Sequence, residues 1–279
     1  MATAKKTPAS PAKPASTEIT NWDEELALQA DASAKMEAST TTGAMFSIKS
    51  GVLSWNESPI ENNQMAVVIT DAILENVAYE SDFDADNPSP PRCFAFGRVS
   101  EEMKPFSTVF ALGQQVNDTC TGCEYNKFGT ADKGRGKKCR NIRRLAIIPA
   151  GMLDGHGKFT MEKDPDSFDK ATMGFMKLPV TSTTGFAAYV KMLAATLRRP
   201  PHGVFTKIKV VPDAKSQFKV LFEPLGLIPN NIMGKVIARH QEAVGSIEQP
   251  YNLELEEDAS KGRGKPAAKG KAPIRGKKF

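Results

Sequence analysis

The four cysteines of the chain are the residues whose spacing most clearly indicates chemistry. They are Cys93, Cys120, Cys123 and Cys139, and the 279 residues contain no other cysteine. The two-residue gap of the CxxC pair lets both thiolates reach one tetrahedral ion, and Gly122 favours the tight turn that such a knuckle needs. Cys139 follows as the second limb of a zinc ribbon would, and Cys93 would come from a different strand. The pattern predicts a structural Zn²⁺ site with four thiolate ligands.

Three other states of these cysteines stay open at this point. A CxxC pair is also typical of redox proteins, four thiolates can hold an iron–sulfur cluster, and buried free thiols need no metal. A catalytic zinc is disfavoured, because it keeps an open position and usually has histidine or carboxylate ligands. The three histidines, at 156, 202 and 240, are isolated from one another in the sequence.

The segment from the CxxC pair to just beyond Cys139 is basic and carries two aromatic residues. Cations neutralise phosphates and aromatic rings stack on exposed bases, so this mixture is typical of nucleic-acid binding without sequence preference. The alternative is a solvated knuckle with both rings packed beneath it. The candidate nucleic-acid-binding residues, which include a tryptophan from an expected strand, are Trp55, Tyr125, Lys127, Phe128, Lys133, Arg135, Lys137, Lys138, Arg140, Arg143 and Arg144.

Positive charge is concentrated in two places. The net charge is +5, yet residues 259–279 hold eight Lys or Arg and no acid, and residues 124–144 hold eight against two acids. The rest of the body is therefore acidic. Such concentration favours a polyanionic partner, although a tail of this composition also serves solubility alone.

Motifs for catalysis are missing from the sequence. The glycine-rich run before Cys139 lacks the spacing of a P-loop and has no Ser or Thr after its lysines. The acidic run at 82–93 lacks the glycine and the final glutamate of a calcium loop. Asp71 and Glu75 fall in an expected strand, where residues four apart are well separated. We expect a protein that is not an enzyme.

Hydrophobic patterning outlines the elements that must position the cysteines and the basic segment. Helical spacing predicts three helices, the second capped by a residue between Thr181 and Thr184 and stopped by Pro200 and Pro201. A loop is expected at 80–91 and a turn at 154–157, because both are rich in residues that break strands. The expected strands are 46–55, 64–80, 93–99, 143–152 and a hairpin of 203–212 with 216–224, and the expected helices are 22–38, 181–200 and 230–246.

These elements predict an α+β fold. We expect an antiparallel OB-like barrel with an inserted four-cysteine zinc knuckle at 93–144 and disordered termini. The expected organisation is a disordered N-terminal arm with a short helix (1–43), a core (44–250), and an acidic stretch followed by a basic disordered tail (251–279).

The sequence also bears on compartment. No apolar run approaches the ~20 residues that span a bilayer. The first residues, MATAKKTPASPAKPAS, lack the apolar core of a secretory signal and the arginines of a transit peptide. We expect a cytoplasmic protein with reduced thiols and no membrane partner.

Three segments resemble zinc-containing proteins from tailed-bacteriophage genomes, some of which are described as single-stranded DNA-binding proteins. The resemblance covers roughly residues 60–225 and lies in the order Pro–Cys, CxxC, Gly/Lys-rich loop, Cys, Arg-Arg-Leu. The resemblance implies zinc ligands at all four cysteines. It also implies that the protein binds single-stranded DNA in phage replication or recombination. Its partners would then be proteins of those processes, and its location the host cytoplasm. The segments are AVVITDAILENVAYESDFDADNPSPPRCFAFG, CTGCEYNKFGTADKGRGKKCRNIRRLAIIP and LPVTSTTGFAAYVKMLAATLRRPPHGVFTKIKV.

The C-terminal tail departs from the usual pattern of single-stranded DNA-binding proteins. Such proteins commonly end in an acidic tail with a terminal aromatic residue, whereas Phe279 follows a basic tail and only LELEED at 253–258 is acidic. We therefore expect the tail to bind DNA directly. The alternative function is a zinc-ribbon adaptor that binds a polymerase or transcription complex, and the least favoured is a zinc-dependent nuclease or primase accessory.

Overall fold

The computed structural model describes residues 26, 29, 44–80 and 89–253. The chain divides into two compact units, residues 1–43 and 44–279, and the fold below is that of the described part of the second. The expected N-terminal arm, apart from residues 26 and 29, most of the expected loop at 80–91 and the basic tail lie outside the described residues. Within the described residues, no helix has the length and apolar character needed to cross a membrane.

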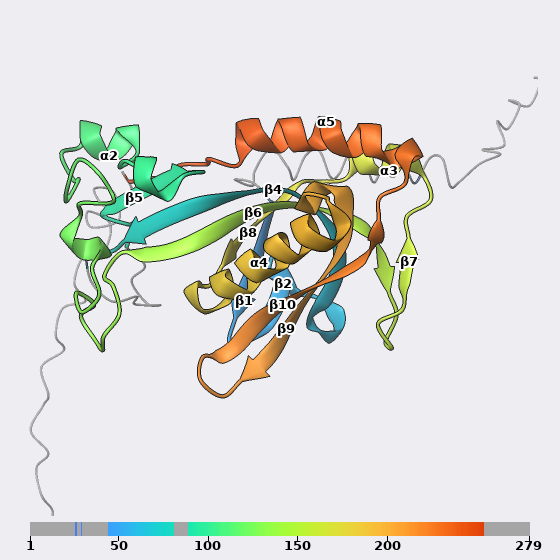
Figure 1. The fold of residues 1–279 in the computed structure, drawn as a ribbon, viewed down its shortest axis with the longest axis horizontal. Helices are drawn as coiled ribbons and strands as arrows, with labels where there is room; N and C mark the ends of the chain where they lie inside the picture. Colours follow the sequence, from blue (N-terminus) through green and yellow to red (C-terminus); the bar gives the residue numbers. More distant parts are fainter. Residues whose placement is uncertain (1–25, 27–28, 30–43, 81–88, 254–279) are drawn as a thin grey trace, which may run out of the picture. The chain divides into compact units, whose positions relative to one another are not determined.

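One large sheet dominates the described residues (Figure 1). Its strand order is β10-β9-β4-β6-β8-β1-β2-β3, while β5 also pairs with β4 and β7 with β6. Every pair is antiparallel except β1 with β8. The strands are β1 (Ala44–Lys49), β2 (Val52–Trp55), β3 (Ser58–Pro59), β4 (Gln64–Ala78), β5 (Cys93–Gly97), β6 (Arg140–Leu153), β7 (Phe159–Met161), β8 (Gly174–Leu178), β9 (Val204–Asp213) and β10 (Gln217–Leu227).

Two long helices cover opposite faces of this sheet. In the view of Figure 1, α5 lies above β4 and β6, and α4 lies below them. Short 3₁₀ turns lie at 61–63, 100–102, 124–126 and 201–203, and a π-helical turn at 193–197 extends α4. The helices are α2 (Ser107–Ala111), α3 (Pro165–Lys170), α4 (Val180–Met192) and α5 (Asn230–Ser246).

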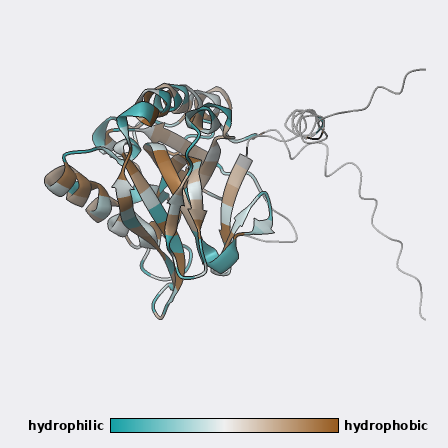
Figure 2. Cartoon of the chain, turned by 90° about the vertical axis from the view of Figure 1, so that its right-hand side faces the viewer, coloured by the Kyte–Doolittle hydropathy of each residue, from teal (hydrophilic) through white to brown (hydrophobic). Residues whose placement is uncertain are grey.

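The alternation of strand side chains divides the core between these two faces. Leu145 and Ile147 of β6 pack with the α4 residues Phe186 and Tyr189. Ile148, on the other face, packs in the cluster that contains the buried residues of α5. In Figure 2 the hydrophobic colouring gathers in the strands of the sheet, and the turns at the strand ends are hydrophilic.

Strand β4 is the centre of the sheet and contains a bulge. Its pairing with β6 shifts register between Ile69 and Asp71, so Thr70 is the extra residue. Before the bulge, odd-numbered residues such as Ile69 face the α4 side; after it, the even-numbered Ala72 faces that side. The odd-numbered Ile73 then faces the cluster beneath the end of α5. The bulge thus reverses which residues of β4 face each core.

The edge of β4 that faces away from β6 is shared by two strands. β9 pairs with residues 64–68 and β5 pairs with residues 74–78. Among the described strands, none pairs with residues 69–73 on this edge. The sheet therefore forks at the bulge, with β5 carrying the cysteine segment away from β9 (Figure 1).

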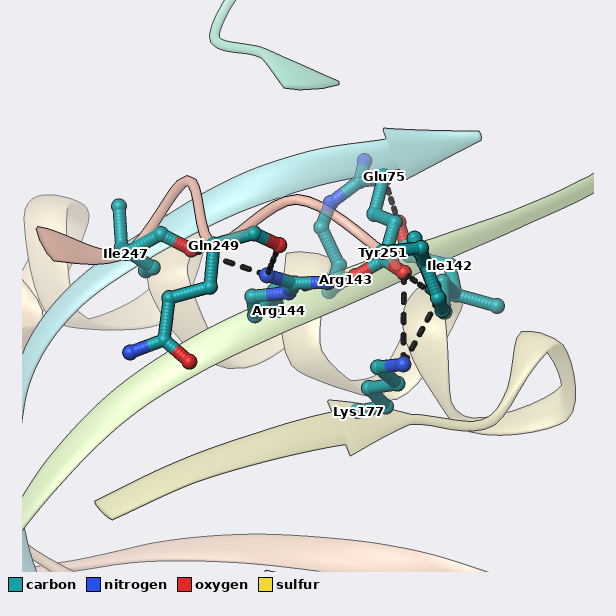
Figure 3. Close-up of polar contacts among 8 residues, drawn as sticks. All are labelled: Glu75, Ile142, Arg143, Arg144, Lys177, Ile247, Gln249 and Tyr251. Atoms are coloured by element: carbon teal, nitrogen blue, oxygen red, sulfur yellow. Dashed lines mark hydrogen bonds and ion pairs between the residues drawn. The ribbon is translucent and has the colours of Figure 1, made fainter. Parts of the chain in front are cut away.

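A buried ion pair links β4 to β6. Glu75 is 0% exposed and accepts a hydrogen bond from Arg144 Nε at 2.7 Å. The Arg144 guanidinium also donates to the carbonyl oxygens of Ile247 and Gln249, at 3.2 Å and 2.7 Å. Tyr251 donates its hydroxyl hydrogen to Glu75 and accepts from Lys177 Nζ at 2.7 Å (Figure 3). The chain after α5 is thereby attached to the sheet.

Comparison with the sequence expectations gives a mixed result. The α+β class is confirmed, and so are the β9–β10 hairpin and the helix at 230–246. No pairing of the described strands joins β10 to β3, so a closed OB-like barrel is not confirmed. The segment 46–55 is a hairpin with its turn at Ser50 and Gly51, both with positive φ, rather than one strand. The expected cap of α4 is wrong: the helix starts after Pro179, without a side-chain cap.

The buried pair predicts a large loss of stability when its acid is removed. Glu75→Ala leaves the Arg144 guanidinium buried without its carboxylate, so we expect the free energy of unfolding to fall by about 3–5 kcal/mol. The measurement is urea denaturation at pH 7. Glu80→Ala is the matched control, because Glu80 pairs with Arg92 on the surface, where the side chains are 68% and 38% exposed, and should cost about 0–1 kcal/mol. Equal losses in the two variants would contradict the assignment.

Candidate metal and nucleic-acid site

The cysteine segment runs from β5 to β6 and is held by backbone hydrogen bonds as well as by apolar contacts of Met103 and Val109. The N–H of Cys120 donates to the carbonyl oxygen of Met103 at 3.0 Å, and that of Cys139 donates to Tyr125 at 2.8 Å. The side-chain amide of Asn126 donates to the carbonyl oxygen of Cys120 at 2.9 Å. These bonds place the CxxC turn, the residues after it and the start of β6 side by side.

All four cysteines line one small cavity. Its volume is about 20 Å³, and the CxxC residues, Cys93 at the start of β5 and Cys139 just before β6 all border it. A volume of this size holds a single water-sized or ion-sized occupant. The cysteines are unpaired and half-buried, or buried in the case of Cys120, so the structure brings the four predicted donors together.

The surroundings of the cavity favour the protonated form of the thiols of Cys93, Cys120 and Cys139. Burial, reinforced by the neighbouring cysteine sulfurs, raises the pKa of Cys93 to about 11 and that of Cys139 to about 12. Burial also raises the pKa of Cys120, against a hydrogen bond with Asn76 that lowers it. Thiolates here therefore need a compensating positive charge, which is what a bound cation supplies.

The sulfur positions themselves do not form a closed ligand set. Within the described residues, no group of three or more His, Cys, Asp or Glu is arranged to hold a metal ion. The four thiols thus share a cavity of suitable size and donor type, without tetrahedral ligation in this geometry. The zinc site stays a prediction.

The loop between the CxxC turn and Cys139 is closed by its own hydrogen bonds. The hydroxyl of Thr130 donates to the carbonyl oxygen of Lys127 at 2.8 Å and accepts from the N–H of Lys138 at 3.0 Å. The N–H of Gly129 donates to the carbonyl oxygen of Gly136 at 2.8 Å, with a φ of +87° that favours glycine. The loop therefore presents its side chains from an ordered backbone.

Phe128 lies on the outside of this loop. Phe128 is 82% exposed, and the ammonium of Lys137 lies 5.1 Å from the centroid of its ring. Covering an exposed phenyl ring removes apolar area from water and is favourable, so Phe128 is available to a partner. Tyr125 is instead half-buried beside the cysteines, with Lys138 Nζ 5.2 Å from its ring centroid. Of the two rings, Phe128 is the one free to stack.

A basic cleft lies beside the loop, between it and the end of β4. Its volume is about 150 Å³, and the Arg140 guanidinium lies 5.9 Å from the ring centroid of Tyr79 within it. One acid, Asp132, takes part through an ion pair with Lys138 at 3.2 Å. Cations therefore outnumber acids among the residues that line the cleft. The cations that line the cleft are Lys133, Lys137, Lys138 and Arg140.

Three predicted residues lie elsewhere. Arg144 is 4% exposed and is taken up by Glu75 and two carbonyl oxygens in the interior. Arg143, its neighbour on β6, faces the opposite side of the sheet. Trp55 ends β2, which β8 and β1 separate from β6, and its ring packs on Phe46 with centroids 4.2 Å apart. Lys127 and Arg135, by contrast, are exposed on the loop.

The sequence reasoning missed three side chains that support the cleft and the cavity. Asn76 contacts Cys120 and accepts a hydrogen bond from Asn141 at 2.7 Å. Asn141 in turn accepts from Lys137 Nζ at 3.0 Å. Tyr79 lies under Arg140. Asn76 follows Glu75 as a polar residue in a mostly apolar strand, which is a local signal, but nothing local pointed to Asn141 or Tyr79.

Comparison with known proteins adds no relative. The chain matches no known family, no curated protein and no solved structure. The resemblance to phage proteins stays an expectation, and function has to be inferred from the described side chains.

Proposed function

We propose that this chain is a non-catalytic protein that binds single-stranded DNA through residues 124–140. The observation that carries the proposal is Phe128, which is 82% exposed on a hydrogen-bonded loop beside a cleft with four cations. A strand would stack one base on Phe128 and place neighbouring phosphates on the cleft. Exposed Lys127 and Arg135 would add charge on either side. Arg143, Arg144 and Trp55 are not part of this surface.

Stacking on an exposed ring selects single strands. A base inside a duplex has both faces covered by its neighbours, so Phe128 could reach one only at an end or after unpairing. RNA offers the same base faces and phosphates, so the affinities for a DNA strand and an RNA strand have to be compared to decide between them. On this proposal the protein acts in DNA replication or recombination, within the cytoplasm of the host if a phage encodes it.

We further propose that a structural Zn²⁺ is bound by Cys93, Cys120, Cys123 and Cys139. The fit rests on the four thiols around one ion-sized cavity and on the need of buried thiolates for positive charge. The metal would join the start of β5, the CxxC turn and the start of β6. Its role would be to hold the loop that presents Phe128, with no part in catalysis.

The DNA-binding proposal predicts a loss of affinity in Phe128→Ala. One stacked base contributes about 1–3 kcal/mol, so the dissociation constant for a labelled oligo-dT should rise about 5- to 150-fold. Fluorescence anisotropy, with the matching duplex and oligo-U in parallel, measures it. Phe110→Ala is the control, because Phe110 is a 38%-exposed ring in α2 outside the cleft, and should leave the affinity unchanged. Equal, weak binding of strand and duplex would favour the zinc-ribbon adaptor instead.

The cleft predicts a salt dependence that its own residues control. Each phosphate neutralised on a single strand contributes about −0.7 to the slope of log affinity against log salt concentration. Lys137→Gln and Arg140→Gln should each reduce the slope by about that amount, while Lys170→Gln, an exposed lysine on α3, should not. Titrations at four salt concentrations measure the slopes. A slope that neither cleft variant changes would remove the cleft from the strand path.

The zinc proposal predicts one metal ion per chain. Elemental analysis of the purified protein should find stoichiometric zinc, and Cys120→Ser should lower both the zinc content and the melting temperature, because metal-binding energy is also folding energy. Thr121→Ser is the control, since it changes the same turn without touching a thiol. Iron in place of zinc, or a melting temperature that a strong chelator leaves unchanged, would refute the structural zinc.

A further inference from the structure

A second cavity lies at the fork of the sheet, away from the cysteines. Its volume is about 490 Å³, within the range of small-molecule sites. It is bordered by residues 69–74 of β4, the stretch around the bulge, and by residues of α4, the turn at 201–203 and α5. It exists because β9 leaves β4 before β5 joins it.

Side chains already bond two backbone groups of the stretch of β4 that borders the cavity. The carbonyl oxygen of Thr70 accepts a hydrogen bond from His240 Nδ1 at 2.7 Å, which fixes the proton of that ring on Nδ1 because a carbonyl can only accept. The N–H of Ala72 is bonded to the Asp71 carboxylate. An added β-strand would have to displace both bonds. These two bonds disfavour an added β-strand as the occupant of the cavity.

The charges that line the cavity are positive in excess. Arg98 binds the Asp71 carboxylate through two hydrogen bonds, at 2.9 Å and 2.6 Å, so this pair is neutral. Burial would raise the pKa of Asp71, but Arg98 and the Ala72 N–H hold it below its usual value. Arg143 and Lys191 also border the cavity, and neither has a carboxylate partner among the described residues.

The contacts of Arg143 within the protein do not account for its half-buried charge. Arg143 is half-buried, and its guanidinium donates a hydrogen bond of 3.3 Å to the carbonyl oxygen of Ile142. Burial lowers the pKa of Arg143, and no carboxylate among the described residues offsets that effect. A partly buried, unpaired cation costs folding energy unless an anion completes it. An anionic ligand in the cavity would complete it.

The other walls of the cavity are suited to a flat ring. Val190 and Phe186 of α4 form an apolar side of the cavity. Pro200 and Pro201, which follow the π-helical turn after α4, also border it. The imidazoles of His202 and His240 stack with centroids 4.3 Å apart and an interplanar angle of 20°. Burial and the neighbouring His240 lower the pKa of His202, so its ring is a neutral hydrogen-bonding group at pH 7.

We propose that the cavity at the fork binds a nucleotide, with Arg143 and Lys191 on its phosphate and its base between the apolar wall of α4 and the histidine pair. A free nucleotide and one unit of a nucleic-acid strand share this chemistry. The site lies on the opposite side of β6 from Arg140, so it does not depend on the function proposed for residues 124–140.

The test is isothermal titration of the whole protein with dTMP and AMP, and with inorganic phosphate as the probe for the anion alone. We expect one nucleotide per chain, weaker binding of phosphate, and a loss of nucleotide affinity of tenfold or more in Arg143→Gln, since hydrogen bonds to charged groups contribute about 1.5–3 kcal/mol. Lys170→Gln and Phe128→Ala should bind nucleotide like the wild type. Competition with an oligo-dT that lacks terminal phosphates distinguishes the two sources of the ligand. If the oligonucleotide displaces the bound nucleotide, the cavity binds one unit of a strand. If it does not, the cavity binds a free nucleotide.

The melting temperature distinguishes a ligand-binding arginine from a structural one. Removing an uncompensated cation should leave the melting temperature of Arg143→Gln unchanged or raised, whereas loss of a structural contact would lower it. The proposal is overturned if the wild type binds neither nucleotide at millimolar concentration, or if Arg143→Gln binds them normally. If Phe128→Ala loses DNA binding but keeps nucleotide binding, both proposals stand; if only one ligand binds the wild type, the other proposal alone fails.

Discussion

The pairing of β4 with β6 is the constraint on which the other features depend. Both strands run the length of the sheet, and their shared ladder leaves the far edge of β4 to be divided between β9 and β5. The β5 half begins at a cysteine and leads into the segment that holds the others. The interval between the halves is the cavity with Arg143. Both candidate sites thus arise from one long strand with two different partners.

The segment between β5 and β6 shows how little regular structure supports the cysteine cavity. Residues 98–139 contain only short helical turns, and connections of this length are uncommon in compact domains unless function or a cross-link maintains them. Backbone hydrogen bonds and Asn76 close the segment around a volume lined by thiols. A four-thiolate metal would add a cross-link to the apolar contacts that Met103 and Val109 already make with residues of β5.

Strand and helix positions were largely predictable because apolar periodicity is a local property. The helix at 230–246 and the hairpin after Pro201 follow from it directly. The forked sheet was not predictable, since a bulge at Thr70 is decided by pairing with β6 rather than by the residues beside it. For the same reason Arg143 and Arg144 looked alike in sequence, although strand alternation sends one to a cavity and the other to Glu75. The spacing of the cysteines predicted that they lie near one another, and they line one cavity, while Tyr79 and Asn141 could be found only from the fold.

The bulge also determines how the chain tolerates changes in length. Thr70 changes the alternation of side chains in β4. Each residue after it faces the side opposite to the one that an unbroken alternation from residues 64–69 would give. Losing one of residues 64–69 while the bulge is kept would move part of the apolar set of the first half to the wrong face. Losing Thr70 itself would leave Ile69 and Asp71 in plain alternation, so that both halves keep their present faces. A change in the length of β4 should therefore be tolerated best at the bulge.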